Sequence, residues 1–314
     1  MHTNWVSLIG NIERDGNQFT LAPLPPSSYL PPTPNTQPNI PLALLKSSIE
    51  FESGIIELEV NLPTPSSICQ IGLTSISDGT SGYINSTTEV FSGLNSLGAP
   101  YGFAKFKNNS WEPLIGSGQG SSITTECWHH LKLHVQGSNL ELFFDGVKVT
   151  TTSQQIMRGQ ISLLLQSHER VSVRNIKISA IEPICFVVMQ FTDDYNELYE
   201  EVIRPTCEKF QYKVLRADDF YSSSVIIDDI TRTIRECAIV IADVTPNNPN
   251  VFYEVGFAHG IGKPTILLSD RKREKLPFDI SGVRTLFYDN TIKGKRSVEE
   301  GLRRHLDAIT IRQP

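Results

Sequence analysis

The stretch AIVIADVTPNNPNVFYEVG, residues 238–256, decides the fold of the second half of the chain. It opens with five apolar residues, 238–242, the composition of a parallel strand that is buried on both faces. The strand ends at Asp243, a turn rich in proline and asparagine follows, and apolar residues recur at helical spacing from Val251. The stretch therefore predicts a strand–turn–helix unit of an α/β sheet.

The same alternation extends over residues 184–314. Strands are predicted at 184–189, 212–215, 238–242, 265–268 and 284–288, and helices at 195–210, around 225–234, at 251–260 and at 298–309. Alternation of this kind predicts a flavodoxin-like, doubly wound parallel sheet with right-handed crossovers. Ligands of such sheets bind at the carboxyl ends of the strands. The residues that follow each strand are therefore the candidates for a functional site.

Residues 1–183 have a different composition. They hold 10 Lys and Arg and 14 Asp and Glu, whereas the shorter remainder holds 18 and 20. Short runs such as 130–135 and 171–178 alternate apolar and polar residues with period two. This pattern predicts an antiparallel β-sandwich of jelly-roll type over 1–183, followed by the α/β domain over 184–314. A proline-rich stretch at about residues 22–41 is expected to form an extended arm, because proline cannot donate to a β-ladder.

The stretch FFDGV, residues 143–147, is the strongest hairpin signal in the first domain, because Asp145-Gly146 suits the positive φ angles of a type I′ turn. Together with Trp128 and the alternating residues after it, this hairpin resembles that of concanavalin A-like and laminin G-like jelly rolls. The resemblance covers about residues 40–180, and it implies a domain that binds sugars, peptides or nothing. A packing or oligomerisation module is as good an interpretation as a lectin.

Composition excludes several other classes of protein. The net charge of -6 argues against a protein that grips duplex nucleic acid. No apolar run reaches the about 18 residues of a membrane span, and residues 1–5 lack the features of a signal peptide. Five cysteines without a Cys-x-x-Cys pair indicate reduced thiols in a cytoplasmic protein and no metal site. Glycine-rich dinucleotide, P-loop and Gly-x-Ser-x-Gly signatures do not occur.

Polar residues follow the first three strands of the predicted α/β sheet. Gln190 and Phe191 follow the first strand, Arg216 and Asp218 follow the second, and Asp243 ends the third. We expect these side chains to line a pocket at the carboxyl edge of the sheet. Arg216 either binds a diphosphate or pairs with a neighbouring aspartate, and the sequence leaves both roles open.

The turn before the third helix supplies further candidates. Asn250 is a suitable N-cap for a helix that begins at Val251, and it could also hydrogen-bond a ribose. Asn248 is better explained as a turn residue. Tyr253 could stack on a base, although core packing is the preferred interpretation.

Glu254 is the strongest candidate for chemistry. It lies three residues after Val251, beside the buried stripe of the predicted helix, and is expected to be partly desolvated yet ionised by the helix N-terminus. Gly256 and Gly260 would let a ligand approach closely. Such a carboxylate suits N-glycosidic cleavage, in which positive charge develops on a sugar. The alternative is an acidic first-turn residue without a function.

Five segments together are similar to prokaryotic TIR-like proteins, which are relatives of the nucleoside 2-deoxyribosyltransferases: residues 186–191, 216–218, 241–245, 248–259 and 263–264. The string Asn-Pro-Asn-Val-x-Tyr-Glu-x-Gly, from Asn248 to Gly256, is the most specific part. The resemblance implies that Glu254 is the catalytic carboxylate, which attacks the sugar in the transferases and serves NAD cleavage in TIR enzymes. It also implies that Asp243 contacts the substrate. The residues ahead of Glu254 are bulkier than the glycine-containing string of the transferases.

The resemblance further implies that NAD is the substrate, so that no cofactor is needed. TIR-like domains commonly complete one another's sites, which implies a homo-oligomer. The fused sandwich would sense a sugar, nucleotide or protein trigger, as in bacterial antiphage effectors. The leading hypothesis is therefore an NAD glycohydrolase or cyclase.

Two alternatives stay open. The first is a nucleoside or nucleotide N-glycosidase or deoxyribosyltransferase, which would release bases from nucleosides and leave NAD intact. The second is a non-catalytic module that binds a nucleotide signal or serves as a scaffold.

Overall fold

The computed structural model describes residues 4–23, 40–75, 88–119, 123–219, 226–273 and 275–310. Most of the predicted proline-rich arm, residues 24–39, lies outside these ranges. The chain divides into two compact units, one of residues 1–135 and 139–181 and the other of residues 136–138 and 182–314. The division after Ile181 lies two residues before the boundary that the composition predicts.

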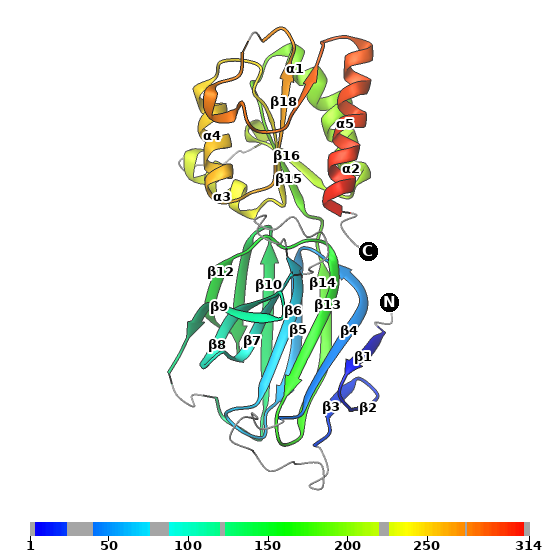
Figure 1. Cartoon of the computed structure of the whole chain (residues 1–314), viewed down its shortest axis with the longest axis vertical. Coiled ribbons are helices and arrows are strands. Elements are labelled where there is room, and N and C mark those ends of the chain that lie inside the picture. The colour runs from blue at the N-terminus through cyan, green and yellow to red at the C-terminus, as the bar shows by residue number, and fades with distance from the viewer. Residues whose placement is uncertain are drawn as a thin grey trace. The chain divides into compact units, whose positions relative to one another are not determined.

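The first unit contains two seven-stranded antiparallel sheets that form a jelly-roll-like β-sandwich (Figure 1). One sheet has the order β1 (Trp5–Ile9), β4 (Leu42–Phe51), β13 (Gly159–Gln166), β6 (Ile68–Ser75), β7 (Thr88–Ser96), β8 (Ala99–Lys107) and β9 (Ser110–Ser117). The other has the order β12 (Val147–Ser153), β11 (Asn139–Phe144), β10 (Trp128–Gln136), β5 (Gly54–Asn61), β14 (Val171–Ala180), β3 (Gln18–Leu21) and β2 (Ile12–Asp15).

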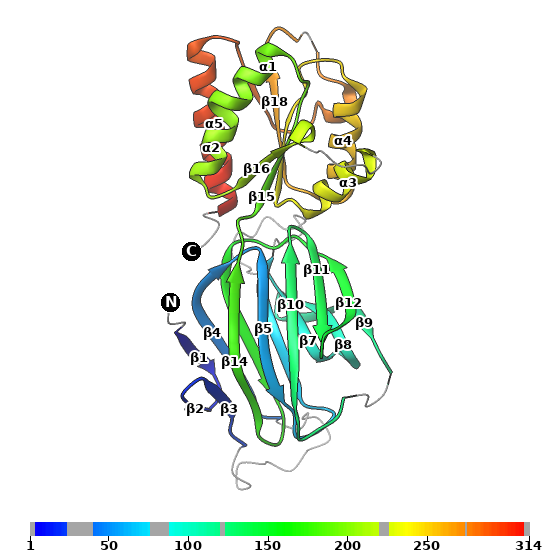
Figure 2. The same ribbon diagram turned by 180° about the vertical axis from the view of Figure 1, so that it is seen from behind.

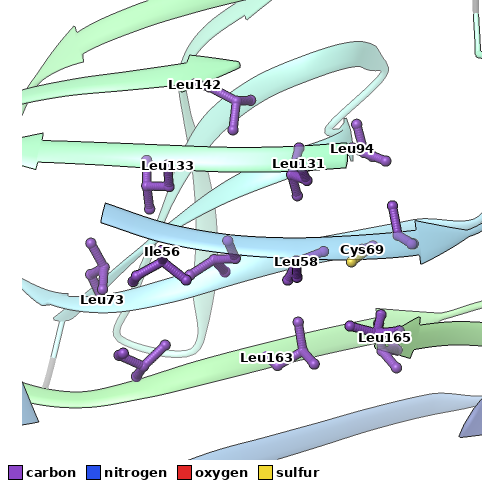
Figure 3. Packing of buried hydrophobic residues seen from close by; sticks show 14 of the residues in the cluster. Ile56, Leu58, Cys69, Leu73, Leu94, Leu131, Leu133, Leu142, Leu163 and Leu165 are labelled. Atoms are coloured by element: carbon purple, nitrogen blue, oxygen red, sulfur yellow. The ribbon is translucent and has the colours of Figure 1, made fainter. Parts of the chain in front are cut away.

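The core of the sandwich lies between the two sheets, and the period-two pattern explains why. In β5 every second residue is buried, and the buried set includes Ile56 and Leu58. These two side chains belong to one cluster with Cys69 and Leu163 from the facing sheet (Figure 3). Burying each large aliphatic side chain contributes about 1.5–3 kcal/mol. Hydrophobic burial between the sheets therefore accounts for the cohesion of this unit.

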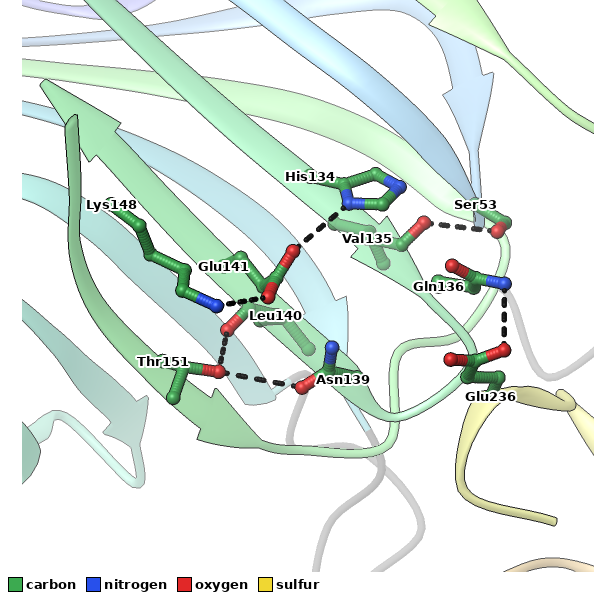
Figure 4. A network of polar contacts seen from close by, with 10 residues as sticks. All are labelled: Ser53, His134, Val135, Gln136, Asn139, Leu140, Glu141, Lys148, Thr151 and Glu236. Carbon is green, nitrogen blue, oxygen red and sulfur yellow. Dashed lines mark hydrogen bonds and ion pairs between the residues drawn. The ribbon is translucent and has the colours of Figure 1, made fainter. Parts of the chain in front are cut away.

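Polar residues of the same strands point away from the core. On the sheet that contains β10 and β11, Glu141 accepts a hydrogen bond from Lys148 at 3.0 Å and lies 3.2 Å from Nδ1 of His134 (Figure 4). Such cross-strand pairs contribute about 0.2–1 kcal/mol each. They help to set the register of the hairpins on the outer face.

The predicted hairpin at Asp145-Gly146 is confirmed. Both residues have positive φ angles, 47° and 82°, as a type I′ turn requires, and the turn joins β11 to β12. Strands β2, β3, β4, β7 and β9 were not predicted. Strand β9 is mostly exposed and contains Pro113, so it lacks the alternation that marks the other strands.

The second unit is built on a five-stranded parallel sheet. Its order is β16 (Lys213–Arg216), β15 (Ile184–Val188), β17 (Ile239–Asp243), β18 (Thr265–Asp270) and β19 (Thr285–Tyr288). Counted along the unit this is 2-1-3-4-5, one of the common orders of doubly wound α/β sheets. The five predicted strands are thereby confirmed.

Helices cover both faces of this sheet (Figure 2). One face carries α1 (Asp193–Leu198), a π-helical turn (Tyr199–Ile203), α2 (Arg204–Lys209) and α5 (Ile292–Thr310), and the other carries α3 (Ile226–Glu236) and α4 (Pro249–Gly260). Residues Ile239 and Ile241 of the central strand pack on the first face, whereas Val240 and Ala242 pack on the second. Each face therefore has its own hydrophobic core.

Three helices differ from their predicted form. The predicted helix at 195–210 is interrupted by the π turn just before Pro205, which has no N–H to continue the regular hydrogen bonds. Helix α4 begins at Pro249, two residues earlier than predicted. Helix α5 begins at Ile292 because the hydroxyl of Thr291 accepts a hydrogen bond from the Gly294 N–H. Its first turns lack the apolar stripe on which the prediction depended.

Candidate functional site

Asp243 ends the central strand β17 and is 1% exposed. One carboxylate oxygen accepts a hydrogen bond from the Thr245 N–H at 2.9 Å, and the other accepts one from the Tyr288 hydroxyl at 2.6 Å. Burial raises the pKa of Asp243, and these two hydrogen bonds oppose that rise. Each oxygen therefore already accepts one hydrogen bond from within the protein, and the contact with substrate that the resemblance implies for Asp243 stays a prediction.

A cavity of about 290 Å³ lies beside this network at the carboxyl edge of the sheet. It is lined by Asp194, Tyr195, Leu198, Thr245, Asp270, Lys272, Arg273, Tyr288 and Asn290. The Thr245 hydroxyl accepts a hydrogen bond from the Asp270 N–H at 2.8 Å, so it joins the ends of β17 and β18. Asp243 thus holds two walls of the cavity, Thr245 and Tyr288, without lining it.

Arg273 supplies positive charge to the same cavity. Its guanidinium donates to the Thr245 carbonyl at 2.7 Å and lies 5.5 Å from the ring of Phe252 on α4. These contacts fix the direction of the guanidinium. The cavity therefore combines carboxyl, hydroxyl and cationic groups on ordered strand ends.

Glu254 lies on α4 and is 8% exposed. The buried stripe of this helix consists of Val251, Val255 and Ala258, as predicted, and Glu254 flanks it. No hydrogen bond or ion pair joins the carboxyl group of Glu254 to another of the described residues. Burial alone raises its pKa from 4.5 to about 7.

The expectation that Glu254 stays ionised therefore needs correction, because a pKa of about 7 leaves it partly protonated at neutral pH. The helix N-terminus does not offset the effect of burial, because the helix begins earlier than predicted. With Pro249 as the first residue of α4, Glu254 is the sixth, beyond the first turn in which the helix N-terminus favours an anion. Gly256 and Gly260 lie open, since a Cβ added at either would meet nothing within 4 Å among the described residues.

Asp243 and Glu254 do not share one face of the sheet. Asp243 has the same strand parity as Ile239 and Ile241, which pack against α1, α2 and α5. Its partner Tyr288 belongs to that same core. Glu254 belongs to α4, which covers the opposite face. The cavity of about 290 Å³ is consequently lined from the side of α1 and β19 and does not include Glu254.

Arg216 ends β16 and is 7% exposed. Its guanidinium donates to both carboxylate oxygens of Asp218, at 2.6 and 2.5 Å, and to the side-chain oxygen of Asn196 at 2.9 Å. It also lies 4.2 Å from the ring of Tyr199. Of the two roles left open by the sequence, the structure shows the pairing with the neighbouring aspartate.

The other predicted site residues lie close to these elements. Gln190 is half-buried after β15, and Phe191, 48% exposed, lies 5.1 Å from the Arg216 guanidinium. Asn250 is not the N-cap of α4. That cap is Asn248, whose side chain accepts a hydrogen bond from the Asn250 N–H at 3.0 Å, because Pro249 is suited to the first helical position. Tyr253 is 53% exposed, so the preferred interpretation as a core residue is wrong.

Several residues that line the cavity were not predicted as site residues. Asp270 and Tyr288 end β18 and β19, so the rule that selected Asp243 would also have selected them. Thr245 follows the end of β17 by two residues and meets the same rule, whereas Tyr195 lies within α1 and carries no such signal. Within the ranges that the structure describes, no group of three or more His, Cys, Asp or Glu is placed to hold a metal ion. No described helix is long and apolar enough to cross a membrane.

Compared with models of known protein families and with curated proteins, the sequence has no match. Similar solved structures include the carbohydrate-binding module CBM66 from Bacillus subtilis, with a TM-score of 0.39 and 13% identity, covering 55% of this chain and 92% of that one. A β-glucanase from Bacillus licheniformis has a TM-score of 0.35 and 13% identity, covering 55% of this chain and 89% of that one.

A Bacillus subtilis protein of unknown function with a galectin-like fold has a TM-score of 0.38 and 10% identity, covering 55% and 87%. These similarities concern the β-sandwich. They carry no information on what either unit binds or catalyses.

Proposed function

We propose that the second unit cleaves the N-glycosidic bond of NAD, as a glycohydrolase or cyclase, with Glu254 as the carboxyl group beside the reacting sugar carbon. The observation that carries this proposal is the state of Glu254. The residue is 8% exposed, its carboxyl group has no hydrogen-bond or ion-pair partner among the described residues, and its pKa is raised to about 7. Buried carboxyl groups without partners are rare, and perturbed pKa values of this kind cluster at functional sites.

Cleavage of the N-glycosidic bond of NAD requires few catalytic groups besides a carboxylate near the reacting sugar carbon. When the bond between the ribose and nicotinamide breaks, its electron pair leaves with nicotinamide, which becomes neutral and needs no general acid. Positive charge then develops on the ribose, and an ionised Glu254 would stabilise or trap it. Attack by water would complete hydrolysis, and attack by a group of the same molecule would complete cyclisation.

The wider proposal follows the TIR-like resemblance of residues 184–314. The active form would be a homo-oligomer, and the β-sandwich would sense a sugar, nucleotide or protein trigger in bacterial antiphage defence. In this proposal NAD is a substrate and not a bound cofactor, and the protein acts in the cytoplasm.

The test is incubation of the full chain with NAD and chromatography of the products. We expect release of nicotinamide and loss of that release, by about 100-fold or more, in Glu254→Gln. Glu208→Gln is the matched control, because Glu208 is an exposed glutamate on α2, which covers the opposite face of the sheet. Turnover retained in Glu254→Gln would remove Glu254 as the catalyst.

A panel of nucleosides in the same assay distinguishes the nearest alternative. Release of bases from nucleosides with NAD left intact would identify a nucleoside N-glycosidase or, if the sugar moves to another base, a deoxyribosyltransferase.

A non-catalytic module is the second candidate, and one observation favours it. The cavity of about 290 Å³ at the strand ends does not include Glu254, so a nucleotide fragment could bind there without meeting that carboxyl group. Calorimetry with ADP-ribose, and with Thr245→Val as the variant, tests this. Binding that depends on Thr245, without any product from NAD, would support a sensor rather than an enzyme.

A further inference from the structure

We propose that Cys127, His129 and Asp145 form a nucleophilic thiol site on the β-sandwich, at which Cys127 reacts with hydroperoxides. The three residues belong to the first unit: Cys127 directly precedes β10, His129 lies in β10, and Asp145 is in the turn after β11. The proposal is independent of the function proposed for the second unit, because it uses none of the same residues.

The geometry is that of a nucleophile, a base and a group that orients the base. The Cys127 sulfur lies 3.2 Å from Nε2 of His129, and Nδ1 of His129 lies 2.7 Å from one carboxylate oxygen of Asp145. The other oxygen of Asp145 accepts a hydrogen bond from the His130 N–H at 2.8 Å, which fixes the carboxylate. This is the order of contacts by which a histidine activates a thiol.

The imidazole is placed so that it can accept the thiol proton. With Nδ1–H donating to Asp145, Nε2 carries a lone pair that can accept the proton of Cys127. The carbonyl oxygen of Thr124 also lies 2.8 Å from Nε2, a distance that fits an N–H···O hydrogen bond. Once Nε2 is protonated, the same contact becomes a hydrogen bond, so both ring nitrogens of the imidazolium have acceptors.

The ring is also held in place. His129 is 7% exposed, and its ring centroid lies 4.7 Å from that of Phe144. The residue before the thiol, Glu126, has a φ angle of 61°, and its N–H donates to the Leu62 carbonyl at 2.9 Å. A left-handed conformation is uncommon for a residue other than glycine or asparagine, and such positions are enriched near reactive groups.

Cys127 is the accessible thiol of this chain. It is half-buried, whereas Cys69, Cys185, Cys207 and Cys237 are each 0% exposed. Hydroperoxides are small enough to reach a half-buried sulfur, and the thiol needs no second substrate site for them. Since Cys127 and Asp145 face opposite nitrogens of the ring, the three residues do not converge on a metal ion.

The step balances with a hydroperoxide as oxidant. The proton of the Cys127 thiol passes to Nε2 of His129, and the sulfur attacks the terminal oxygen of the peroxide. The S–O bond forms as the O–O bond breaks, and the departing oxygen takes the proton from His129 as water or an alcohol. Sulfur is oxidised to a sulfenic acid, and the peroxide is reduced.

The first experiment uses the unmodified full chain with hydrogen peroxide and dimedone, a trap for sulfenic acids, followed by peptide mass spectrometry. We expect Cys127 to be labelled about tenfold or more faster than N-acetylcysteine at the same pH, because a positioned base assists the attack. The four buried cysteines are internal controls and should stay unlabelled. A rate no higher than that of N-acetylcysteine would overturn the proposal without recourse to any variant.

The second experiment compares Asp145→Asn with His130→Gln. Asparagine can keep the hydrogen bond to the His130 N–H, but its amide nitrogen would face Nδ1 of His129 and favour the tautomer with a proton on Nε2. That tautomer cannot accept the thiol proton, so the labelling rate should fall about tenfold or more. His130 is adjacent in β10 with its side chain toward Glu57, so His130→Gln should react like the unmodified protein.

Two further readouts separate this role from a structural one. A ¹⁵N spectrum of the imidazoles should show the proton of His129 moving from Nδ1 to Nε2 in Asp145→Asn, with an unchanged near-ultraviolet circular dichroism spectrum. Iodoacetamide reports nucleophilicity towards another electrophile. If Cys127 reacts rapidly with iodoacetamide yet forms no sulfenic acid, hydroperoxides are the wrong class of substrate. Equal rates in folded Asp145→Asn and the unmodified protein would refute the relay.

Discussion

At the scale of single residues, Glu254 carries an energetic cost that its position explains. A carboxyl group with a pKa of about 7 in the folded protein, against 4.5 as its usual value, binds a proton more tightly when the chain is folded. Its contribution to stability is therefore complete below pH 4.5 and is lost as the pH rises through about 7. Above about pH 7 the ionised Glu254 therefore lowers the free energy of unfolding.

This cost predicts that Glu254→Gln stabilises the protein at alkaline pH. Glutamine does not titrate. The free energy of unfolding of Glu254→Gln, relative to that of the unmodified protein, should therefore rise by up to about 3 kcal/mol between pH 4.5 and pH 8.5. Urea unfolding of both proteins at the two pH values measures this change. Glu208→Gln should show no comparable trend. A constant difference between Glu254→Gln and the unmodified protein would mean that Glu254 ionises normally.

The same pKa predicts the pH dependence of the proposed reaction. If the ionised form of Glu254 stabilises the ribosyl cation, the rate of nicotinamide release should increase with pH and level off above about 7. The rate at saturating NAD, followed from pH 5.5 to pH 9, checks this. A rate that falls over this interval would assign the opposite protonation state to the active enzyme.

Tyr288 and Asp243 form a buried polar contact beside the cavity. Replacing Tyr288 by phenylalanine leaves a carboxylate oxygen without its 2.6 Å hydrogen bond at a residue that is 1% exposed. We expect a loss of about 1–3 kcal/mol in the free energy of unfolding. Tyr253→Phe is the matched control, since Tyr253 is 53% exposed, and its stability should change by less than about 0.5 kcal/mol. Equal stabilities of the two variants would contradict the proposed network.

At the scale of elements, the start of α4 sets where Glu254 lies. Asn248 caps the helix and Pro249 occupies its first position, so Glu254 falls in the second turn. A helix that began at Val251 would have placed Glu254 in the first turn, where the helix N-terminus favours an anion. The difference of two residues therefore changes the electrostatics of the candidate catalytic group.

The cap is open to a direct test. Asn248→Ala should destabilise the protein by about 1 kcal/mol, because the Asn250 N–H loses its acceptor. Asn250→Ala should be nearly neutral, since Asn250 is exposed and contributes its backbone to the cap. Thermal unfolding of the two variants side by side distinguishes them. A larger effect at Asn250 would restore Asn250 as the N-cap.

At the scale of the whole molecule, the described cavity and Glu254 lie apart. The cavity of about 290 Å³ is just below the range of about 300–1,000 Å³ that is typical for ligand pockets, and it lies on the opposite face of the sheet from Glu254. Under the proposed function, residues of a second copy would complete the surroundings of Glu254.

The expected consequence is that specific activity depends on protein concentration. Nicotinamide release per chain should increase over a dilution series from nanomolar to micromolar, in parallel with the oligomer fraction seen by sedimentation velocity. Glu254→Gln should assemble in the same way without turnover. Constant specific activity over the whole series would show that a single chain is sufficient.

Much of both architectures follows from local pattern. Period-two alternation identified strands such as β10 and β14, and continuous apolar runs identified β15 and β17, because burial on one or two faces dictates those compositions. Pattern failed where burial is weak, as in β9, and where a cap rather than an apolar stripe begins a helix, as in α5.

The sequence by itself determined the two fold classes, the sandwich hairpin at Asp145-Gly146 and the choice of Glu254 as the residue to examine. Only the tertiary structure decided that Asp243 bonds to Tyr288, that Glu254 lies across the sheet from the cavity, and that Asp145 meets His129. The physical reason is that burial pattern is a local property of the chain. Which side chains meet depends on strand parity, on the first residue of each helix and on pairing between distant strands.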